Sequence, residues 1–209
     1  ARTGVVPADR AIGLPQQVRS GVYRVRMRGM AADKLAPHFA QTPWQRVRAD
    51  GDAVDLAVQA FPADRIPTEP FPVRGARNGE LPHPAALRRY LQDSPTLGLG
   101  DPALRDAAKR ATRDATTAMG AVRAIHGWVY RELDKDAQAM GFASAPDTLA
   151  QGHGDCTEHA VLAAALLRAV GLPSRAVVGL AYQPSPNAAL PGTFVFHMWN
   201  EVYLRQGED

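Results

Sequence analysis

The sequence of 209 residues contains a single cysteine, and lysine occurs only at positions 34, 109 and 135. One thiol cannot form a disulfide within the chain, and it is compatible with a reducing or an oxidising compartment. No apolar run approaches the roughly 20 residues of a membrane-spanning helix, so we expect no membrane span in this chain. The net charge is only +3, and no basic run is interleaved with aromatic residues. We therefore expect no nucleic-acid partner.

With 45% hydrophobic and 22% charged residues, the composition is that of a globular protein. Residues 1–60 include two stretches of alternating polarity, at 21–28 and 53–60, which predict a small β segment belonging to a larger N-terminal domain. Residues 61–100 contain seven prolines and are predicted to be an extended linker. Helical and strand patterns then fill residues 101–209, which we expect to be the functional core.

The cysteine lies at the start of an expected helix. Gly152 and Gly154 precede it and permit a tight backbone approach. Asp155 is predicted to cap the helix and Glu158 to complete a capping box, which makes Cys156 the first helical residue. Its sulfur would then lie near unpaired N–H groups and the positive end of the helix dipole. Both favour the nucleophilic thiolate, although a lone cysteine is often a small buried hydrophobe.

A histidine near the end of the chain is the candidate base. Residues 174–182 and 193–204 are predicted strands, joined by a proline-rich loop. Alternation in the second strand places His197, Trp199 and Glu201 on one face. A histidine in such an apolar strand needs a polar partner, and an isolated one is commonly a hydrogen-bonded core residue. Its position after a helix-capped cysteine favours a catalytic role.

The segment GDCTEHAVLAAALLRAVGLPSRAVVGLAY, followed by FHMWNEVYL, resembles the core of the transglutaminase-like superfamily, in its bacterial type. The matching features are Gly-Asp-Cys, the turn Leu-Leu-Arg-Ala-x-Gly-Leu-Pro, and His-x-Trp-x-Glu-Val-Tyr. The resemblance implies an α+β fold with a papain-like layout. In that layout helices pack on an antiparallel sheet and the nucleophile stands at a helix N-terminus; here an N-terminal β segment precedes it.

The resemblance also assigns catalytic residues. Cys156 matches the nucleophile of the family and His197 its general base, while an orienting aspartate normally lies on the next strand. This chain ends at Asp209, only 12 residues after His197. We therefore expect a core cut short at its C-terminal end, with the third residue of the triad beyond Asp209. The alternative is that the chain turns back early enough for Asp209 itself to serve.

These residue types predict acyl transfer on an amide bond of a protein or peptide. The thiolate of Cys156 attacks the carbonyl, His197 protonates the leaving amine, and a thioester results. The backbone N–H of Cys156 is a natural oxyanion donor. Water then gives hydrolysis, as in a protease or amidase, and a second amine gives transamidation. Hydrolysis is slightly favoured because no amine-binding feature stands out. No cofactor and no metal ion are needed.

Two alternatives use the same residues. Cys156, His159 and His197 could bind zinc, since Cys-x-x-His is an acceptable ligand spacing. The chain could also be a catalytically inactive interaction module of the same fold. The presence of both Cys156 and His197 argues against the second alternative.

Overall fold

The computed structural model describes residues 5–61, 66–67, 69–72, 83–136, 142–187 and 190–205. The chain divides into two compact units, one made of residues 1–6, 66–181 and 194–209 and the other of residues 7–65 and 182–193. The linker predicted over residues 61–100 lies partly outside the described residues. The domain boundaries predicted at residues 60 and 100 stay predictions.

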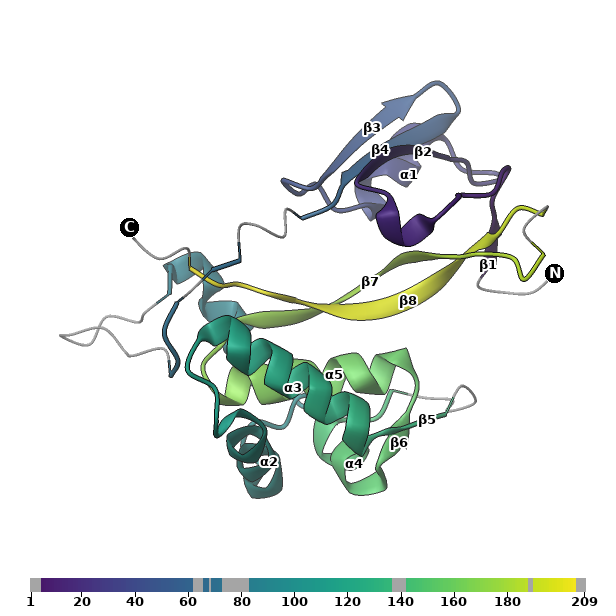
Figure 1. The fold of residues 1–209 in the computed structure, drawn as a ribbon. Helices are drawn as coiled ribbons and strands as arrows, with labels where there is room; N and C mark the ends of the chain where they lie inside the picture. The colour runs from purple at the N-terminus through teal and green to yellow at the C-terminus, as the bar shows by residue number, and fades with distance from the viewer. Residues whose placement is uncertain are drawn as a thin grey trace. The chain divides into compact units, whose positions relative to one another are not determined.

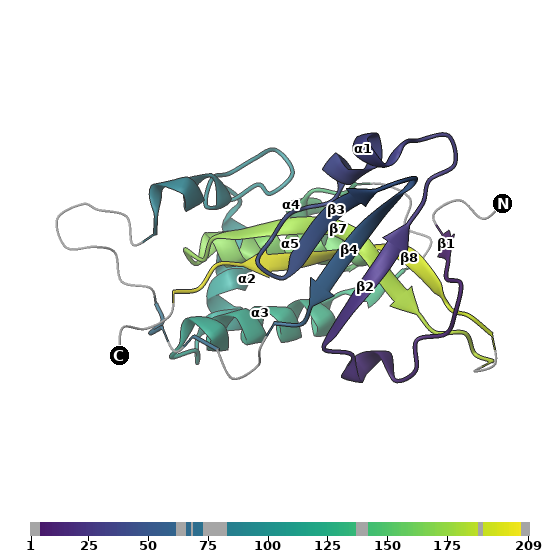
Figure 2. The same ribbon diagram turned by 90° about the horizontal axis from the view of Figure 1, so that it is seen from above.

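The unit of residues 7–65 and 182–193 is built on a three-stranded antiparallel sheet, visible in Figure 2. The strand order is β2-β4-β3, and Leu56 in the central strand pairs with Tyr23 and Val47 on its two sides. The elements of this unit are η1 (Pro15–Gln17), β2 (Ser20–Val25), α1 (Ala32–Leu35), η2 (Ala36–His38), β3 (Gln45–Asp50) and β4 (Ala53–Gln59). Its buried core is small and consists of Ala32, Leu35, Val54 and Leu56.

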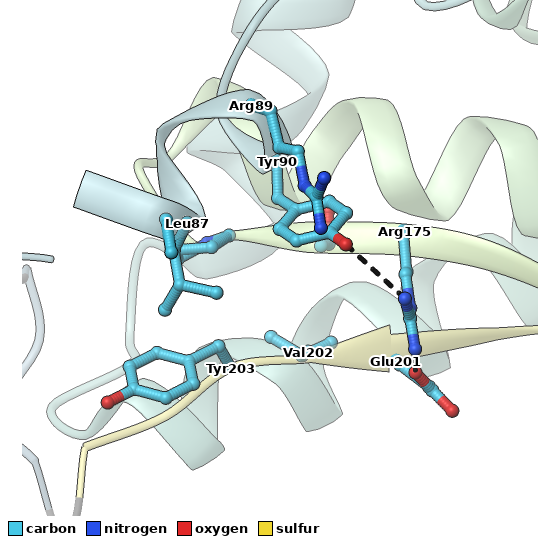
Figure 3. A pocket seen from close by; sticks show the side chains of 10 residues that line it. Leu87, Arg89, Tyr90, Arg175, Glu201, Val202 and Tyr203 are labelled. Carbon is cyan, nitrogen blue, oxygen red and sulfur yellow. Dashed lines mark hydrogen bonds and ion pairs between the residues drawn. The ribbon is translucent and has the colours of Figure 1, made fainter. Parts of the chain in front are cut away.

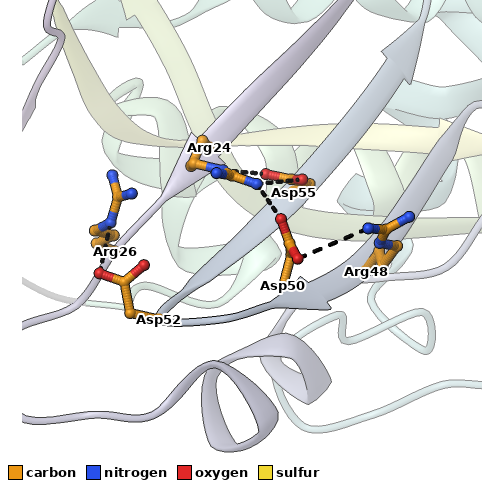
Figure 4. A network of polar contacts seen from close by, with 6 residues as sticks. All are labelled: Arg24, Arg26, Arg48, Asp50, Asp52 and Asp55. Carbon is orange, nitrogen blue, oxygen red and sulfur yellow. Dashed lines mark hydrogen bonds and ion pairs between the residues drawn. The ribbon is translucent and has the colours of Figure 1, made fainter.

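Of the arginines that alternate over residues 21–28, Arg24 lies on β2 and Arg26 and Arg28 follow the end of the strand, and all three are exposed (Figure 4 shows the first two). Arg24 bonds Asp55 at 2.7 Å and also pairs with Asp50, and Arg26 bonds Asp52 at 2.9 Å. These charges are largely exposed, so the network contributes little to stability. It accounts for these arginines as a surface feature.

The other unit contains the main core, and Figure 1 shows its α-helices gathered on one side of the β7–β8 ribbon. Its sheet has the order β1-β8-β7. The elements are β1 (Val5–Pro7), η5 (Ala85–Tyr90), α2 (Pro102–Thr112), α3 (Ala118–Glu132), β5 (Asp134–Lys135), α4 (Ala145–Gln151), β6 (His153–Gly154), α5 (Cys156–Ala169), β7 (Ser174–Gln183) and β8 (Thr193–Val202). The last residue of β1, the last two of β7 and the first of β8 group with the other unit.

Helix α5 is the centre of this core. Every residue from Ala160 to Leu167 is buried, which is typical of a helix covered on all sides. Helices α2 and α3 pack on it through Leu104, Ile125 and Val129. Gly171, the residue after the C-cap, has a φ of 81°, a left-handed conformation that glycine adopts readily and that commonly ends a helix. The core thus holds fixed the helix that carries the cysteine.

The other helices begin at side-chain caps. Asp101 accepts from Leu104 N at 2.9 Å, and Pro102 follows it as the first helical residue of α2. Thr117 caps α3 by accepting from Gly120 N at 3.0 Å. Both caps are predictable from the sequence. Helix α4, capped by Ser144, is not part of the prediction.

Candidate active site

The start of α5 has the predicted capping geometry. The Asp155 carboxylate accepts from Thr157 N at 2.6 Å, and Asp155 N donates to Glu158 Oε2 at 3.0 Å, which closes the capping box. Cys156 is the first residue of the helix, and its free thiol is half-buried. The local sequence therefore places a thiol at the positive end of a buried helix.

Glu158 connects two segments at this point. Its side chain is 3% exposed, and its second oxygen, Oε1, accepts from Ala143 N at 3.4 Å. It occupies the space beside Gly154, where a Cβ atom would meet the Cβ of Glu158 and stand 2.7 Å from its Cγ. Gly152 serves a different purpose, since its φ of 73° ends α4 in a left-handed turn. Both glycines before the cysteine are thus required, for separate reasons.

Hydrogen bonds stabilise the negative charge of the Asp155 carboxylate at the cap. Burial alone would raise the pKa of the Asp155 carboxyl, but the hydrogen bonds from Thr157 and Glu158 outweigh it and lower this pKa below its ordinary value. His159 folds back one turn, and its Nδ1 donates to the Asp155 carbonyl at 2.7 Å. His159 is therefore tied to the cap itself.

One backbone donor beside the thiol is open. Among the described residues, no acceptor takes a hydrogen bond from the Cys156 N–H. The Asp155 carboxylate accepts from the backbone N–H groups of Thr157 and Glu158 instead. A free N–H at the nucleophile is what an oxyanion hole requires. The sequence expectation that Cys156 supplies this donor is consistent with the cap.

His197 lies in the middle of β8 and is exposed. In the part of the chain that the structure describes, no hydrogen bond joins its ring to the Cys156 thiol. The opposite face of β8 contacts α5, because Asn200 Nδ2 donates to the Ala160 carbonyl at 2.8 Å. Strand alternation puts His197 and Asn200 on opposite faces. The pairing of Cys156 with His197 stays a prediction.

Trp199 and Glu201, which share the face of His197, have structural contacts. The Trp199 ring lies across Gly179 of β7, where a Cβ atom would stand 2.9 Å from its Cζ3. Glu201 accepts from Arg175 Nε at 2.8 Å. They hold β7 and β8 together on this face.

Arg175 also lines a pocket of about 370 Å³ between η5, the start of β7 and the end of β8 (Figure 3). It donates to the Tyr90 hydroxyl at 3.3 Å, and the guanidinium of Arg89 lies 4.8 Å from the centre of the Tyr90 ring. The pocket lies along the later half of α5, since its lining residue Ser174 bonds the carbonyl of Ala164, which is eight residues and about 12 Å along the helix from Cys156. It is not the cleft of the candidate active site.

The zinc alternative lacks a ligand set. Within the described residues, no three His, Cys, Asp or Glu side chains are grouped so that they could bind one metal ion, and Cys156, His159 and His197 are no exception. Nor does any helix there have the length and apolar character needed to cross a bilayer. Asp209, which would complete the triad if the chain turned back early, lies outside the described residues.

Two features near the cysteine are absent from the sequence prediction. One is the contact of Glu158 with Ala143, which depends on α4 and its approach to α5. The Ser-Ala-Pro-Asp signature of a capped helix start at Ser144 could have revealed α4. The other is the Asn200 hydrogen bond to α5, which joins residues 40 positions apart. A polar amide in an apolar strand was its only signal.

Comparison with known proteins gives the family and the fold of this chain. Residues 105–208 match the family model of the transglutaminase-like superfamily. A candidate cysteine protease from Cytophaga hutchinsonii has a similar crystal structure, with 16% identity and a TM-score of 0.52, over 95% of this chain and 66% of that one. The periplasmic domain of TgpA from Pseudomonas aeruginosa has 16% identity and a TM-score of 0.50, over 96% of this chain and 64% of that one. No curated protein matches the sequence significantly.

Residues 105–208 therefore make this chain a member of the transglutaminase-like superfamily. The predicted α+β class, with helices packed on an antiparallel sheet, is confirmed. The chain spans just under two thirds of the length of the two structural relatives. At this level of identity they establish the fold alone.

Proposed function

We propose that this chain catalyses acyl transfer from amide bonds of proteins or peptides, with Cys156 as nucleophile and His197 as general base. The observation that carries the proposal is the capped start of α5. It sets the only thiol of the chain at a helix N-terminus. The backbone N–H of Cys156 lies beside this thiol, and no described residue accepts a hydrogen bond from it. Membership of the transglutaminase-like superfamily supports the same chemistry.

The first half of the reaction forms a thioester. Cys156 Sγ, as a thiolate, bonds to the amide carbonyl carbon, and the negative charge moves to the carbonyl oxygen near the Cys156 N–H. As the C–N bond breaks, His197 gives its proton to the departing amine. Because His197 lies on the face of β8 opposite to Asn200, this step requires its ring to turn toward Cys156 when substrate binds.

The second half regenerates the thiol. Water, or a second amine, gives a proton to His197 and bonds to the thioester carbon, and the C–S bond breaks. We favour water, because no described feature near Cys156 offers a binding site for an amine. The reaction would then be hydrolysis, as in a protease or amidase.

Alkylation of Cys156 by iodoacetamide at a series of pH values tests the nucleophile without knowledge of the substrate. Because there is one thiol, the rate reports this site alone. We expect the rate to reach its plateau below the ordinary thiol pKa of about 8.5, and His197→Ala to abolish that plateau. The matched control is His126→Ala, since His126 is an exposed histidine on α3. A wild-type rate that rises only near the ordinary thiol pKa would refute the proposal.

Incubation with casein and a fluorescent primary amine distinguishes the two outcomes of the thioester. Hydrolysis releases ammonia or peptide fragments and leaves the fluorophore free, whereas transamidation attaches it to casein. Cys156→Ser is the control in both assays.

A further inference from the structure

Asn200 connects the helix that carries Cys156 with the strand that carries His197. Its side-chain Nδ2 donates to the Ala160 carbonyl at 2.8 Å, across 40 positions of sequence. Ala160 follows Cys156 by one helical turn, and Asn200 follows His197 by three residues. Among the described residues, this is the hydrogen bond that joins β8 directly to α5.

An asparagine is not what packing alone would select here. Strand interiors favour β-branched and aromatic residues and disfavour Asn. The adjacent position on the same face, Val202, packs on the apolar core. An apolar contact is non-directional, whereas a hydrogen bond requires its donor and acceptor to meet within a few tenths of an ångström. A carbonyl oxygen has two lone pairs, so the Ala160 carbonyl can take this bond in addition to its helical one.

The bond also determines which face of β8 contacts α5. Side chains alternate along a strand, so a shift by one residue would turn Asn200 away from α5 and exchange the faces of His197 and Met198. With Asn200 held on Ala160, neither the position of β8 along α5 nor the direction of His197 can change freely.

A second tether provides a natural comparison. Ser174, at the start of β7, donates its hydroxyl to the Ala164 carbonyl at 3.0 Å. Ala164 lies one turn beyond Ala160, so the two acceptors stand on the same side of α5. Ser174 ties β7 to the helix in the same manner, but its strand does not carry the histidine.

We propose that Asn200 is a positioning residue that sets the place of His197 relative to Cys156 by holding β8 on the second turn of α5. The inference rests on the proposed function of these two residues. Asn200 does not touch substrate; it acts through the strand. Its loss should therefore change the pH dependence of Cys156 reactivity more than the stability of the fold.

The test compares Asn200→Leu with Ser174→Ala, each removing one tether to α5. Thermal unfolding measures the loss of stability in both, and iodoacetamide alkylation across the pH range measures the thiolate. We expect both variants to unfold at lower temperature. Only Asn200→Leu should lose the low-pH plateau, with a rate at pH 6 lower by about ten- to a hundredfold, since a displacement near 1 Å has such effects on catalytic groups. Asn200→Asp, which keeps the volume and removes the donor, replaces Asn200→Leu if the latter does not fold.

The outcomes separate the two proposals. If the wild type has the plateau and Asn200→Leu or Asn200→Asp retains it as Ser174→Ala does, the positioning role is overturned while the proposed function stands. If the wild type itself lacks the plateau, the proposed function fails and the positioning role fails with it.

Discussion

A Cβ atom on Gly154 would stand 2.7 Å from Cγ of Glu158, and nearer still to its Cβ. Real Cβ atoms do not approach other carbons so closely, so the absence of a side chain at position 154 is what lets Glu158 fold back over the helix start. From there its carboxylate bonds the Asp155 N–H and the Ala143 N–H. The glycine immediately before the Asp-Cys pair is thus part of the cap.

Gly154→Ala is expected to break the capping box. The added methyl group must displace Glu158, which is 3% exposed and has no free space to occupy. Overpacking of this kind costs about 1–3 kcal/mol, and the lost cap adds about 1 kcal/mol. Thermal or urea unfolding measures the loss.

Gly100→Ala serves as its control, because nothing lies within 4 Å of a Cβ built at that position. Equal unfolding temperatures for the two alanine variants would contradict the proposed packing of Glu158.

Asp155→Asn is expected to cost stability only where the carboxylate is charged. Asn caps helices nearly as well as Asp, so the difference isolates the charge at the helix N-terminus, about 0.3–1 kcal/mol. The folded pKa of Asp155 is lowered from its ordinary value of 3.8. The stabilisation is therefore complete above pH 3.8 and disappears as the pH falls through the lower, folded value. Urea unfolding of both proteins between pH 2 and 7 measures this. A difference that grew on acidification would have the wrong sign.

Gly179→Ala is expected to displace the Trp199 ring, because the new methyl group would stand 2.9 Å from Cζ3 and closer to the end of the ring. We expect a loss of about 1–3 kcal/mol. Trp199→Leu removes the clash, so Gly179→Ala should cost much less in that background. A double-mutant cycle with urea unfolding measures the coupling, and additive effects would show that the two side chains do not meet.

The pKa of the Tyr90 phenol is expected to lie below its ordinary value. Burial works against this, but hydrogen bonds from Arg175 and Arg89 outweigh it and lower the pKa of Tyr90 from 10.0. Arg175→Leu should therefore raise the pKa of Tyr90. Absorbance titration of the wild type against Tyr90→Phe isolates this one phenol. An unchanged titration in Arg175→Leu would mean that Arg175 does not reach the hydroxyl.

The local features of this chain are the ones that its sequence predicts well. Asp155, Glu158 and Gly171 lie within a few residues of the helix ends that they define, so their spacing alone predicts α5. Residues 21–28 alternate in polarity, and alternation is a property of a strand itself; the structure has a strand, β2, over the first part of this stretch. The predicted strands at 174–182 and 193–204 differ from β7 and β8 by no more than two residues at either end.

Contacts between distant segments are less accessible to such reasoning. β5 pairs with β6 in parallel through only two residues on each side, Asp134 with His153 and Lys135 with Gly154. Two residues carry no periodic pattern, so nothing in the sequence marks them. The Asn200 bond to Ala160 likewise depends on how a strand crosses a helix. The pairing of Cys156 with His197 would be such a contact; the order of the elements and the motif resemblance predict it, and it stays a prediction.

The shared space of Gly154 and Glu158 has an evolutionary consequence. Two positions that occupy one volume cannot accept substitutions independently. A relative that acquires a side chain at the glycine position should carry a shorter one at the glutamate position, and its helix would then need another acceptor for the cap N–H. In sequence comparisons the two positions should therefore change together. Gly152 has open space around it, so only its left-handed backbone conformation should restrict which residues can replace it.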